Sequence, residues 1–273
     1  MTLADKIKAV VLITGASSGL GRALAMVYAK KGHALMLTGR DSAELEKTVA
    51  MVNDMGGTVY YFVQDLAATD AVDNLIDFIK RQSLRIAILI NNAGLGSHTE
   101  FSNCLDIDLS LLLTVNIQAL VLLTHRIVPM MVVQQHGLIV NIASVYAYTS
   151  VPKQVVYAAS KAFVKSFSLG LAMDLKPYGI AVSCICPGST TQTKFRQRMG
   201  FDLAKKAFSS SADAVAELIY VSLQKPRLIY IPLWYNRIFV RLMHLLPHRW
   251  VPDLVGFIIY RLRKIKETHR EHI

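Results

Sequence analysis

The stretch that decides the fold is Thr14-Gly15-Ala16-Ser17-Ser18-Gly19-Leu20-Gly21. An apolar run at 9–14 leads into it and predicts a strand, and helical periodicity follows it from 19 to about 30. Glycines at such a junction permit a tight turn, bring the backbone close to a pyrophosphate and let the helix pack closely on the strand. The helix N-terminus offers unpaired N–H groups to phosphate, and the two serines add hydroxyl donors. The stretch therefore predicts a dinucleotide site, although the spacing GxxxGxG alone also occurs in plain glycine-rich turns.

The same alternation of strand and helix continues along most of the 273 residues, and it is typical of a parallel sheet wrapped by helices. We expect one doubly wound Rossmann-type α/β domain at 1–232, with a seven-stranded, mostly parallel sheet and helices on both faces. A separate C-terminal extension would occupy 233–273. The expected strands lie at 9–14, 34–38, 58–64, 86–91, 138–143, 181–185 and 228–231, and the expected helices at 19–30, 42–55, from 70 onward, 108–132, 154–176 and 212–223.

The composition excludes several classes of protein. Hydrophobic residues make up 53% and charged residues 18%, which is ample for a core and excludes disorder over most of the chain. Three cysteines, without a CxxC or HExxH motif, exclude a disulfide scaffold and a metal site and indicate a reducing, cytoplasmic compartment. The apolar stretch 109–133 is interrupted by Asn116, Gln118, His125 and Arg126, so we expect a buried helix there instead of a membrane span. We expect no signal peptide.

The residue after the second strand discriminates between the two nicotinamide cofactors. An acidic side chain there would accept a hydrogen bond from the ribose 2′-OH and repel a 2′-phosphate. This chain has Arg40, whose guanidinium can contact a 2′-phosphate through two charge-assisted hydrogen bonds. Asp41 beside it complicates the choice, because Arg40 could be a solvated surface residue and Asp41 only a helix cap. NADP is therefore favoured, with NAD as the alternative.

Two residues of an expected helix, Tyr157 and Lys161, are spaced i and i+4, which places them one turn apart on the same face. A free phenol titrates near pH ~10, and a neighbouring ammonium would lower that pKa. Ser144 follows the fifth strand at the carboxyl edge, where such sheets bind ligands. Asn116 lies inside an apolar helix. It is either a satisfied core amide or the place where the helix opens to hold a relay water to Lys161.

Two turns complete the set at this edge. Asn91-Asn92-Ala93-Gly94 ends the fourth strand, and Pro187-Gly188 after the sixth could form the floor under a nicotinamide ring. With TGASSGLG at 14–21, Asn116, Ser144 and YAASK at 157–161, these motifs resemble those of the classical short-chain dehydrogenase/reductase family, in the family's order over residues 1 to about 231.

The resemblance implies a role for each matching residue. Tyr157 would be the general acid or base, Ser144 would bind the substrate oxygen, and Lys161 would lower the pKa of the phenol and hold the nicotinamide ribose. Asn116 would anchor the proton relay. The family's carboxamide-binding Thr has no single counterpart, because three threonines follow Gly188 at slightly different spacings. With Thr190 as its candidate, the expected cofactor contacts are Gly15, Ser17, Ser18, Gly19, Leu20, Gly21, Arg40, Asp65, Leu66, Asn92, Ala93, Gly94, Tyr157, Lys161, Pro187, Gly188 and Thr190.

The resemblance also implies an activity: hydride transfer between a nicotinamide cofactor and an alcohol or carbonyl group. The apolar tail and the Met-, Leu- and Phe-containing loop after Gly188 favour an apolar, lipid- or steroid-like substrate. The alternative is a catalytically vestigial NADP(H)-binding sensor or a module that recruits partners to a membrane. The family further suggests a homo-oligomer, a dimer or tetramer paired through the two long helices.

The tail is strongly basic. Residues 226–273 hold nine Lys and Arg against three Asp and Glu, a net of +6 out of the total of +11. Arg237, Arg241, His244 and His248 form one stripe of a helix among aliphatic residues, and a similar mixture recurs over 254–266. With Trp234 and Trp250, this pattern fits either a peripheral position at the inner, anionic face of a membrane or packing over the substrate entrance, on this domain or a second subunit.

Within the family that the chain resembles, such a tail is similar to that of a bacterial-type subgroup of broad substrate range. Nucleic acid is not an expected partner, because the basic residues alternate with aliphatic ones and no nucleic-acid-binding motif occurs.

Overall fold

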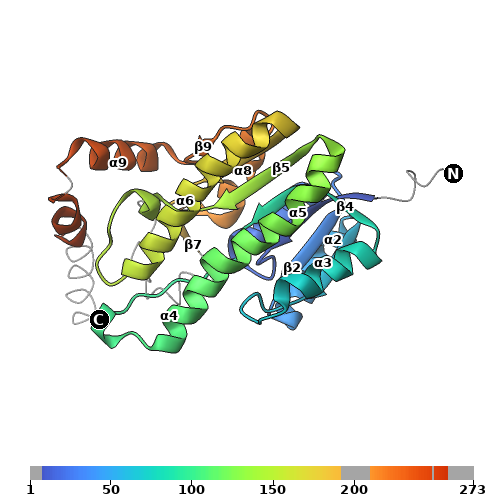
Figure 1. The fold of residues 1–273 in the computed structure, drawn as a ribbon, viewed down its shortest axis with the longest axis horizontal. Coiled ribbons are helices and arrows are strands. Elements are labelled where there is room, and N and C mark those ends of the chain that lie inside the picture. The colour runs from blue at the N-terminus through green and yellow to red at the C-terminus, as the bar shows by residue number, and fades with distance from the viewer. Residues whose placement is uncertain (1–7, 192–209, 248, 258–273) are drawn as a thin grey trace.

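The computed structural model describes residues 8–191, 210–247 and 249–257 (Figure 1). Several expectations fall outside this part of the chain. They are the short helical segment expected between Gly188 and Ser210, the threonine at 193, the last histidine of the basic stripe at 248, and the second half of the tail from 258 onward.

The sheet has seven strands in the order β3-β2-β1-β4-β5-β6-β9, and every pairing in it is parallel. All seven expected strands are present, with ends displaced by two residues at most. The chain winds outward from β1 in both directions, so a crevice opens at the carboxyl ends of β1 and β4. The strands are β1 Lys8–Thr14, β2 Leu35–Gly39, β3 Val59–Val63, β4 Leu84–Asn91, β5 Gly137–Ile142, β6 Ile180–Ile185 and β9 Ile229–Tyr230.

Helices cover both faces of the sheet (Figure 1). The helices α1 (Gly19–Lys30), α2 (Ser42–Asp54) and α8 (Ala212–Leu223) pack on one face, and α3 (Ala71–Arg81), α5 (Leu120–Gln134) and α6 (Val155–Leu175) on the other. Successive strand residues point to opposite faces. Ile13 therefore lies in the first core cluster and Leu12 in the second, and both are fully buried. Burial on both faces explains why the strands are continuous apolar runs.

The long apolar helix expected at 108–132 is made of three consecutive pieces. An α-helical start, α4 (Asp106–Leu113), is followed by a π-helical turn, η3 (Thr114–Ala119), and then by α5. Among the described residues, Asp106–Gln134 is the segment long and apolar enough to cross a membrane, a property that core helices share. Here α5 packs on the sheet through a buried stripe, as expected of a core helix. The stripe is Leu123, Ile127 and Met131.

Several short elements of the structure were not expected from the sequence. They are the single 3₁₀ turns η2 (Phe101–Asn103), η4 (Val145–Tyr148) and η5 (Lys176–Tyr178), and the paired β7 (Thr190–Thr191) and β8 (Ser210–Ser211). Such elements are too short for hydrophobic periodicity to reveal them. Of these, η4 matters for function, because its N-cap residue is Ser144.

The tail begins with α9 (Trp234–Leu245), and residues 251–257 are helical as well. The helix α9 ends two residues before Pro247, which lacks the N–H that would continue a helix. Met243 of α9 packs with Val251 and Val255 against Val151 and Ala158 of the domain. The tail thus lies against η4 and the start of α6, at the end of the molecule away from α2 and α3 (Figure 1).

Candidate active site

A pocket opens at the carboxyl edge of the sheet, where the topology places the crevice. All the expected cofactor and catalytic residues line it except Gly21 and Asn116. The expected residues that line the pocket come from seven separate parts of the sequence, from the glycine-rich turn at 15 to Thr190.

Two glycines of the glycine-rich turn stand where there is no room for a side chain. Gly15 has a φ of +66°, and a Cβ there would lie 2.9 Å from the Cα of Ala93. A Cβ on Gly21 would lie 2.2 Å from the carbonyl oxygen of Gly15. Gly21 therefore does not line the pocket; it lets α1 pack against the turn, which is the part expected of the third glycine. The cradle that results fits a dinucleotide phosphate group.

Hydrogen bonds join the turn to the end of β4. The Thr14 hydroxyl accepts from the backbone N–H of Asn92 and of Ala93, both at 3.0 Å. In return, the Asn92 side-chain amide donates to the carbonyl of Thr14 at 2.9 Å and to that of Gly15 at 3.3 Å. These contacts hold the two strand ends in a fixed relation, so the NNAG motif is more than a simple turn.

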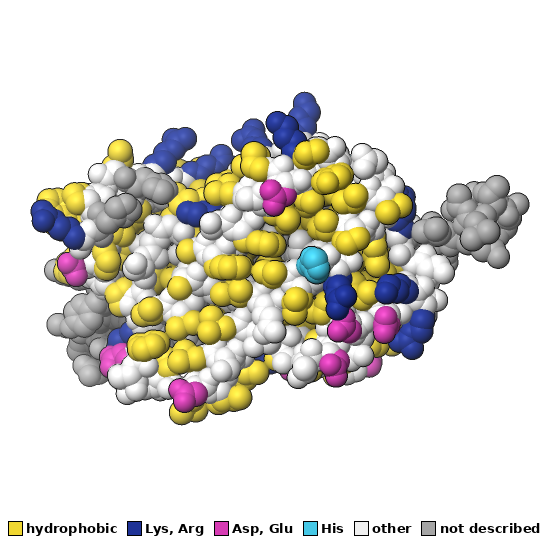
Figure 2. Space-filling model, viewed as in Figure 1, with side chains coloured by type: hydrophobic (Ala, Val, Ile, Leu, Met, Phe, Trp, Pro, Cys, Tyr) yellow, Lys and Arg dark blue, Asp and Glu magenta, His cyan; other side chains and the backbone are white. Residues whose placement is uncertain are grey.

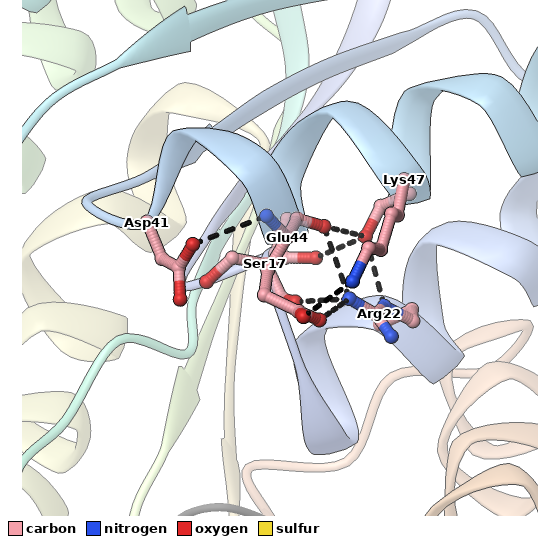
Figure 3. A network of polar contacts seen from close by, with 7 residues as sticks. Ser17, Arg22, Asp41, Glu44 and Lys47 are labelled. Carbon is pink, nitrogen blue, oxygen red and sulfur yellow. Dashed lines mark hydrogen bonds and ion pairs between the residues drawn. The ribbon is translucent and has the colours of Figure 1, made fainter.

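A polar network behind the turn was not expected from the sequence (Figure 3). Arg22 of α1 donates to the carbonyl of Ser17, to Thr48 Oγ1 at 2.9 Å and to Glu44 Oε2 at 2.7 Å. Glu44 is also paired with Lys47 at 2.9 Å. Arg22 thus ties the phosphate-binding turn to α2. The GLGR sequence holds no signal for this role, because the partners of Arg22 lie 22 and 26 residues away.

At the far end of the pocket, Arg40 and Asp65 face each other, with 4.0 Å between Nη1 and Oδ2. Both side chains remain about half exposed. Asp41 is a helix cap: its Oδ1 accepts from the backbone N–H of Glu44 at 3.1 Å. One oxygen of the Asp41 carboxylate is thereby engaged at the N-terminus of α2, and both Asp41 and Arg40 line the pocket.

The three expected catalytic side chains converge at the opposite end of the pocket. Ser144 hydrogen-bonds the phenol of Tyr157. The Nζ of Lys161 lies 5.9 Å from the centre of the Tyr157 ring and donates to the carbonyl of Ile142 at 2.8 Å. All three side chains are buried. The i, i+4 spacing on α6 and the strand-end position of Ser144 therefore bring these groups together as expected.

The electrostatics differ from expectation in one respect. Burial is the main influence on the Tyr157 phenol and raises its pKa, the hydrogen bond from Ser144 lowers it, and Tyr146 raises it further. Burial also lowers the pKa of Lys161 to about 8, while Cys184 and Cys186 act in the opposite direction. The net shift at Tyr157 is therefore upward, although the sequence argument expected Lys161 to bring it down. Desolvation is the largest influence because the phenol lies in the protein interior.

Asn116 lies in the π-helical turn, and the structure gives it the partners expected of a satisfied core amide. Its Oδ1 accepts from Leu95 N at 2.7 Å, and its Nδ2 donates to Leu95 O at 2.9 Å and to Ser160 Oγ at 3.0 Å. The amide is therefore a satisfied core group, and the helix also opens at this residue. A Cβ on Gly94 would lie 3.4 Å from both Asn116 Oδ1 and Lys161 Nζ, so these two groups border the same small space.

A second buried network supports the catalytic end and was also missed. Asn91 Nδ2 donates to Thr124 Oγ1 and to Asn141 Oδ1, each at 2.9 Å. Asn141 Nδ2 in turn donates to Ser168 Oγ on α6 at 2.9 Å. The chain of bonds links β4, β5, α5 and α6. Polar residues within otherwise apolar strands were a usable signal, because a buried amide requires partners.

Some pocket residues escaped the sequence argument because they belong to no motif. They lie at strand ends or in the π-helical turn, and their strand-end positions could have revealed most of them. They are Gly39, Gln64, Leu95, Val115, Ile142 and Ala143. Cys184 and Cys186, two residues apart, lie on the same side of the chain, with their buried sulfurs 3.8 Å apart.

Comparisons with known proteins agree with this geometry. Residues 9–203 match the family described as short chain dehydrogenase. Sulfoacetaldehyde reductase 2 of Chromohalobacter salexigens is 34% identical over 225 residues, which cover 80% of this chain and 89% of that protein.

Two solved structures have the same fold. A short-chain dehydrogenase from Sphingobium yanoikuyae in complex with NADPH superposes with a TM-score of 0.76 at 31% identity, covering 87% of this chain and 94% of the other. A short chain dehydrogenase/reductase from Burkholderia phymatum in complex with NAD superposes with a TM-score of 0.77 at 26% identity, covering 88% and 94%.

The family match spans well over half of the chain, and its strand ends carry the residues that line the pocket. The chain therefore belongs to the short-chain dehydrogenase family, and it is an NAD(P)-dependent oxidoreductase that acts on CH–OH groups.

Proposed function

We propose that this enzyme interconverts an apolar alcohol and its carbonyl compound with NADP(H), and that Ser144, Tyr157 and Lys161 carry out the catalysis. The observation that supports this most is that the three side chains meet in the pocket that the glycine-rich turn opens. The cofactor supplies or accepts the hydride; the protein residues orient the reactants and manage the proton.

Tyr157 is proposed as the group that gives a proton to the substrate oxygen in reduction and takes it in oxidation. The phenol is protonated near neutral pH, which is the form a general acid in carbonyl reduction needs, although burial raises its pKa and so makes it a weaker acid. Ser144, hydrogen-bonded to that phenol, is placed to donate to the same oxygen and stabilise its developing charge. Lys161 would hold the nicotinamide ribose from below.

Asn116 is proposed as a positioning residue for proton supply. It fixes the backbone of Leu95 and the hydroxyl of Ser160, and its Oδ1 borders the space next to the Lys161 ammonium. A water held there would connect Lys161 with solvent. The opening of the helix at Asn116 supports this role, because π-helical turns are frequent at functional sites.

NADP is proposed over NAD. Arg40 lines the adenosine end of the pocket with a half-exposed guanidinium, and Asp41, which also lines the pocket, has one carboxylate oxygen bound to the backbone at the N-terminus of α2. The Sphingobium relative is complexed with NADPH and the Burkholderia relative with NAD, so the fold accepts either cofactor. The charge at Arg40 is the feature of this chain that favours the phosphorylated one.

The substrate is proposed to be apolar, lipid- or steroid-like. Tyr157 belongs to a cluster of hydrophobic side chains with Leu95, Leu112, Tyr146 and Val156. A carbonyl compound that presents its oxygen to Tyr157 would place its remaining surface among such groups. Compounds of this kind partition into lipid, so we propose that the enzyme acts at the inner surface of a membrane.

The C-terminal extension, residues 233–273, is proposed as an addition to the catalytic domain at 1–232 that shields the substrate end. The described part of it packs on Val151 and Ala158, the latter next to Tyr157. This arrangement supports the covering role considered for the tail, and it is the feature by which we assign the chain to a bacterial-type subgroup of broad substrate range.

A homo-oligomer is proposed from the outer face of α4, α5 and α6. Hydrophobic side chains gather over α5 and α6 in Figure 2, and several are well exposed. They include Leu113, Leu122, Val133, Phe163 and Met173. A second copy placed on this face would bury them, as in the interfaces of stable homodimers.

The experiment is to measure NADPH and NADH consumption by the full chain over a panel of aliphatic, aromatic and polycyclic ketones and aldehydes. We expect turnover with NADPH and with the larger apolar members. The competing proposal is a vestigial cofactor-binding sensor. Tight NADPH binding without turnover on any member of the panel, or with the corresponding alcohols and NADP, would favour it over an enzyme.

A further inference from the structure

The helix α9 has two different faces. Its inward residues Asn236, Val240 and Met243 are buried against the domain. On the opposite side, Trp234, Ile238, Leu242 and Leu245 recur at i, i+4, i+8 and i+11 and are exposed by 69%, 46%, 52% and 81%. A helix that packs on its own domain ordinarily presents polar residues to solvent, so this outer stripe requires another explanation.

The short helical segment that follows continues the pattern. Trp250, Leu254 and Phe257 are exposed, while Val251 and Val255 between them are buried against Met243. The two tail segments therefore pack on each other and on the domain through buried residues such as Met243, Val251 and Val255. The α9 stripe and three large side chains of the following segment face outward. We refer to Trp234, Ile238, Leu242, Leu245, Trp250, Leu254 and Phe257 as the outer tail residues.

The charged residues around the outer tail residues are mostly positive. Arg237, Arg241 and Arg249 are exposed, and Asp253 is the single acid in 234–257, a net of three minus one, or +2. In the described part of the chain, none of these arginines forms an ion pair with an acid. Arg237 donates instead to the carbonyls of Ile231 and Pro232.

This mixture of charge and apolar surface selects one kind of partner. Two copies of the chain that met through this face would bring its net positive charge against the same charge, and like charges opposed across an interface cost free energy. An anionic lipid surface would instead pair the arginines with phosphates and take up the apolar side chains, with tryptophan at the headgroup level.

We propose that the outer tail residues dock the enzyme on an anionic phospholipid membrane. The proposal rests on the proposed function, because it supplies a route for the apolar substrate. The inward side of the same helices contacts Val151, Ala158 and Tyr146, and Tyr146 lies edge-on to Tyr157 with ring centres 6.3 Å apart. Tyr146 thus connects the inward side of the tail with the catalytic tyrosine, which places the docked surface at the substrate end of the enzyme.

The test is vesicle flotation of the full chain. Vesicles of phosphatidylcholine alone are compared with vesicles that also contain phosphatidylglycerol, at low and at high salt. We expect binding to the anionic vesicles, weakened by salt, and little binding to the neutral ones.

Two variants and a matched control locate the surface. Leu245→Glu should reduce anionic vesicle binding by about tenfold or more. It removes an apolar side chain that would be buried in the membrane and adds a negative charge that the anionic lipids repel. Arg241→Ala should reduce it by about fivefold. Val221→Glu, on the exposed face of α8 at 65% exposure, introduces the same charge elsewhere and should leave binding unchanged.

The proposal is overturned if the full chain does not float with anionic vesicles, or if Leu245→Glu and Val221→Glu bind alike. It is also overturned if Leu245→Glu converts a dimer into a monomer, since a second copy would then occupy the face. Turnover of a water-soluble ketone without vesicles distinguishes failure of the membrane-docking proposal from failure of the proposed function. If turnover persists while flotation fails, docking alone is wrong; if flotation succeeds without any turnover, the proposed function is wrong.

Discussion

Arg40 is the residue on which the choice of cofactor depends. Replacing it by Ala should weaken NADPH binding by about tenfold to a hundredfold, since a hydrogen bond to a charged group contributes about 1.5–3 kcal/mol. NADH binding should change little, because NADH has no 2′-phosphate. Fluorescence titration of both cofactors measures this. Arg81→Ala, an exposed arginine at the end of α3, is the control. Equal losses for the two cofactors would refute the phosphate contact.

Lys161 should give cofactor binding a pH dependence. Burial lowers its pKa to about 8, so the ammonium is present below that pH and is lost as the pH rises through it. We expect NADPH affinity to fall between about pH 7 and pH 9, and Arg40→Ala to retain the same inflection at weaker affinity. Affinity that stays level across this range would show that the charge of Lys161 does not contribute.

The catalytic residues show what a sequence can and cannot reveal at this scale. The spacing of Tyr157 and Lys161 and the strand-end position of Ser144 follow from periodicity, and the structure brings all three together. The direction in which the pKa of Tyr157 shifts did not follow from the sequence, because the burial of the phenol depends on packing by Tyr146 and the surrounding core. Spacing along a helix is local information, whereas desolvation is a property of the folded interior.

At the scale of elements, the clamp between α1 and α2 depends on Arg22. Replacing Arg22 by Leu should lower the free energy of unfolding by about 1–3 kcal/mol and weaken NADPH and NADH alike, because the Ser17 carbonyl and Glu44 lose a partly buried partner. Thermal melting and cofactor titration measure the two effects.

Lys47→Ala provides the control for Arg22. Lys47 pairs with the same carboxylate but is 65% exposed, and exposed pairs contribute about 0–1 kcal/mol. If the two variants destabilise the protein to the same extent, the clamp has no special part in holding the turn.

The elements differ in how far their sequence predicts them. The helices α1 and α8 begin and end where periodicity and flanking residues place them, at 19–30 and 212–223. The long helix was predicted as a unit, but its π-helical turn follows from tertiary bonds of Asn116 to Leu95 and Ser160. The 3₁₀ turn η4 likewise depends on the Ser144 cap, a contact of one residue that leaves no periodic pattern.

At the scale of the whole molecule, the face of α5 and α6 should control the oligomeric state. Leu122→Glu places a charge within the proposed contact, and we expect it to convert an oligomer into a monomer in sedimentation or light-scattering measurements. Met51→Glu is the matched control, since Met51 on α2 has the same exposure of 42%. A wild-type chain that sediments as a monomer, or variants that behave alike, would contradict this interface.

The overall topology was predictable because every strand is a short apolar run between turn residues, and parallel sheets impose a single winding rule. The placement of the tail was not, because its inward and outward residues are both apolar. The inward face of the tail is distinguished from its outward face by packing, such as that of Met243 on Val251 and Val255.

The most direct test of the whole account is Tyr157→Phe, which removes one hydroxyl from the pocket. We predict that NADPH still binds within about twofold of the wild type, while turnover of the best ketone falls by about 10²–10⁴-fold because the general acid is lost. Full turnover by the variant would contradict the assignment of Tyr157, and with it the proposed chemistry of the site.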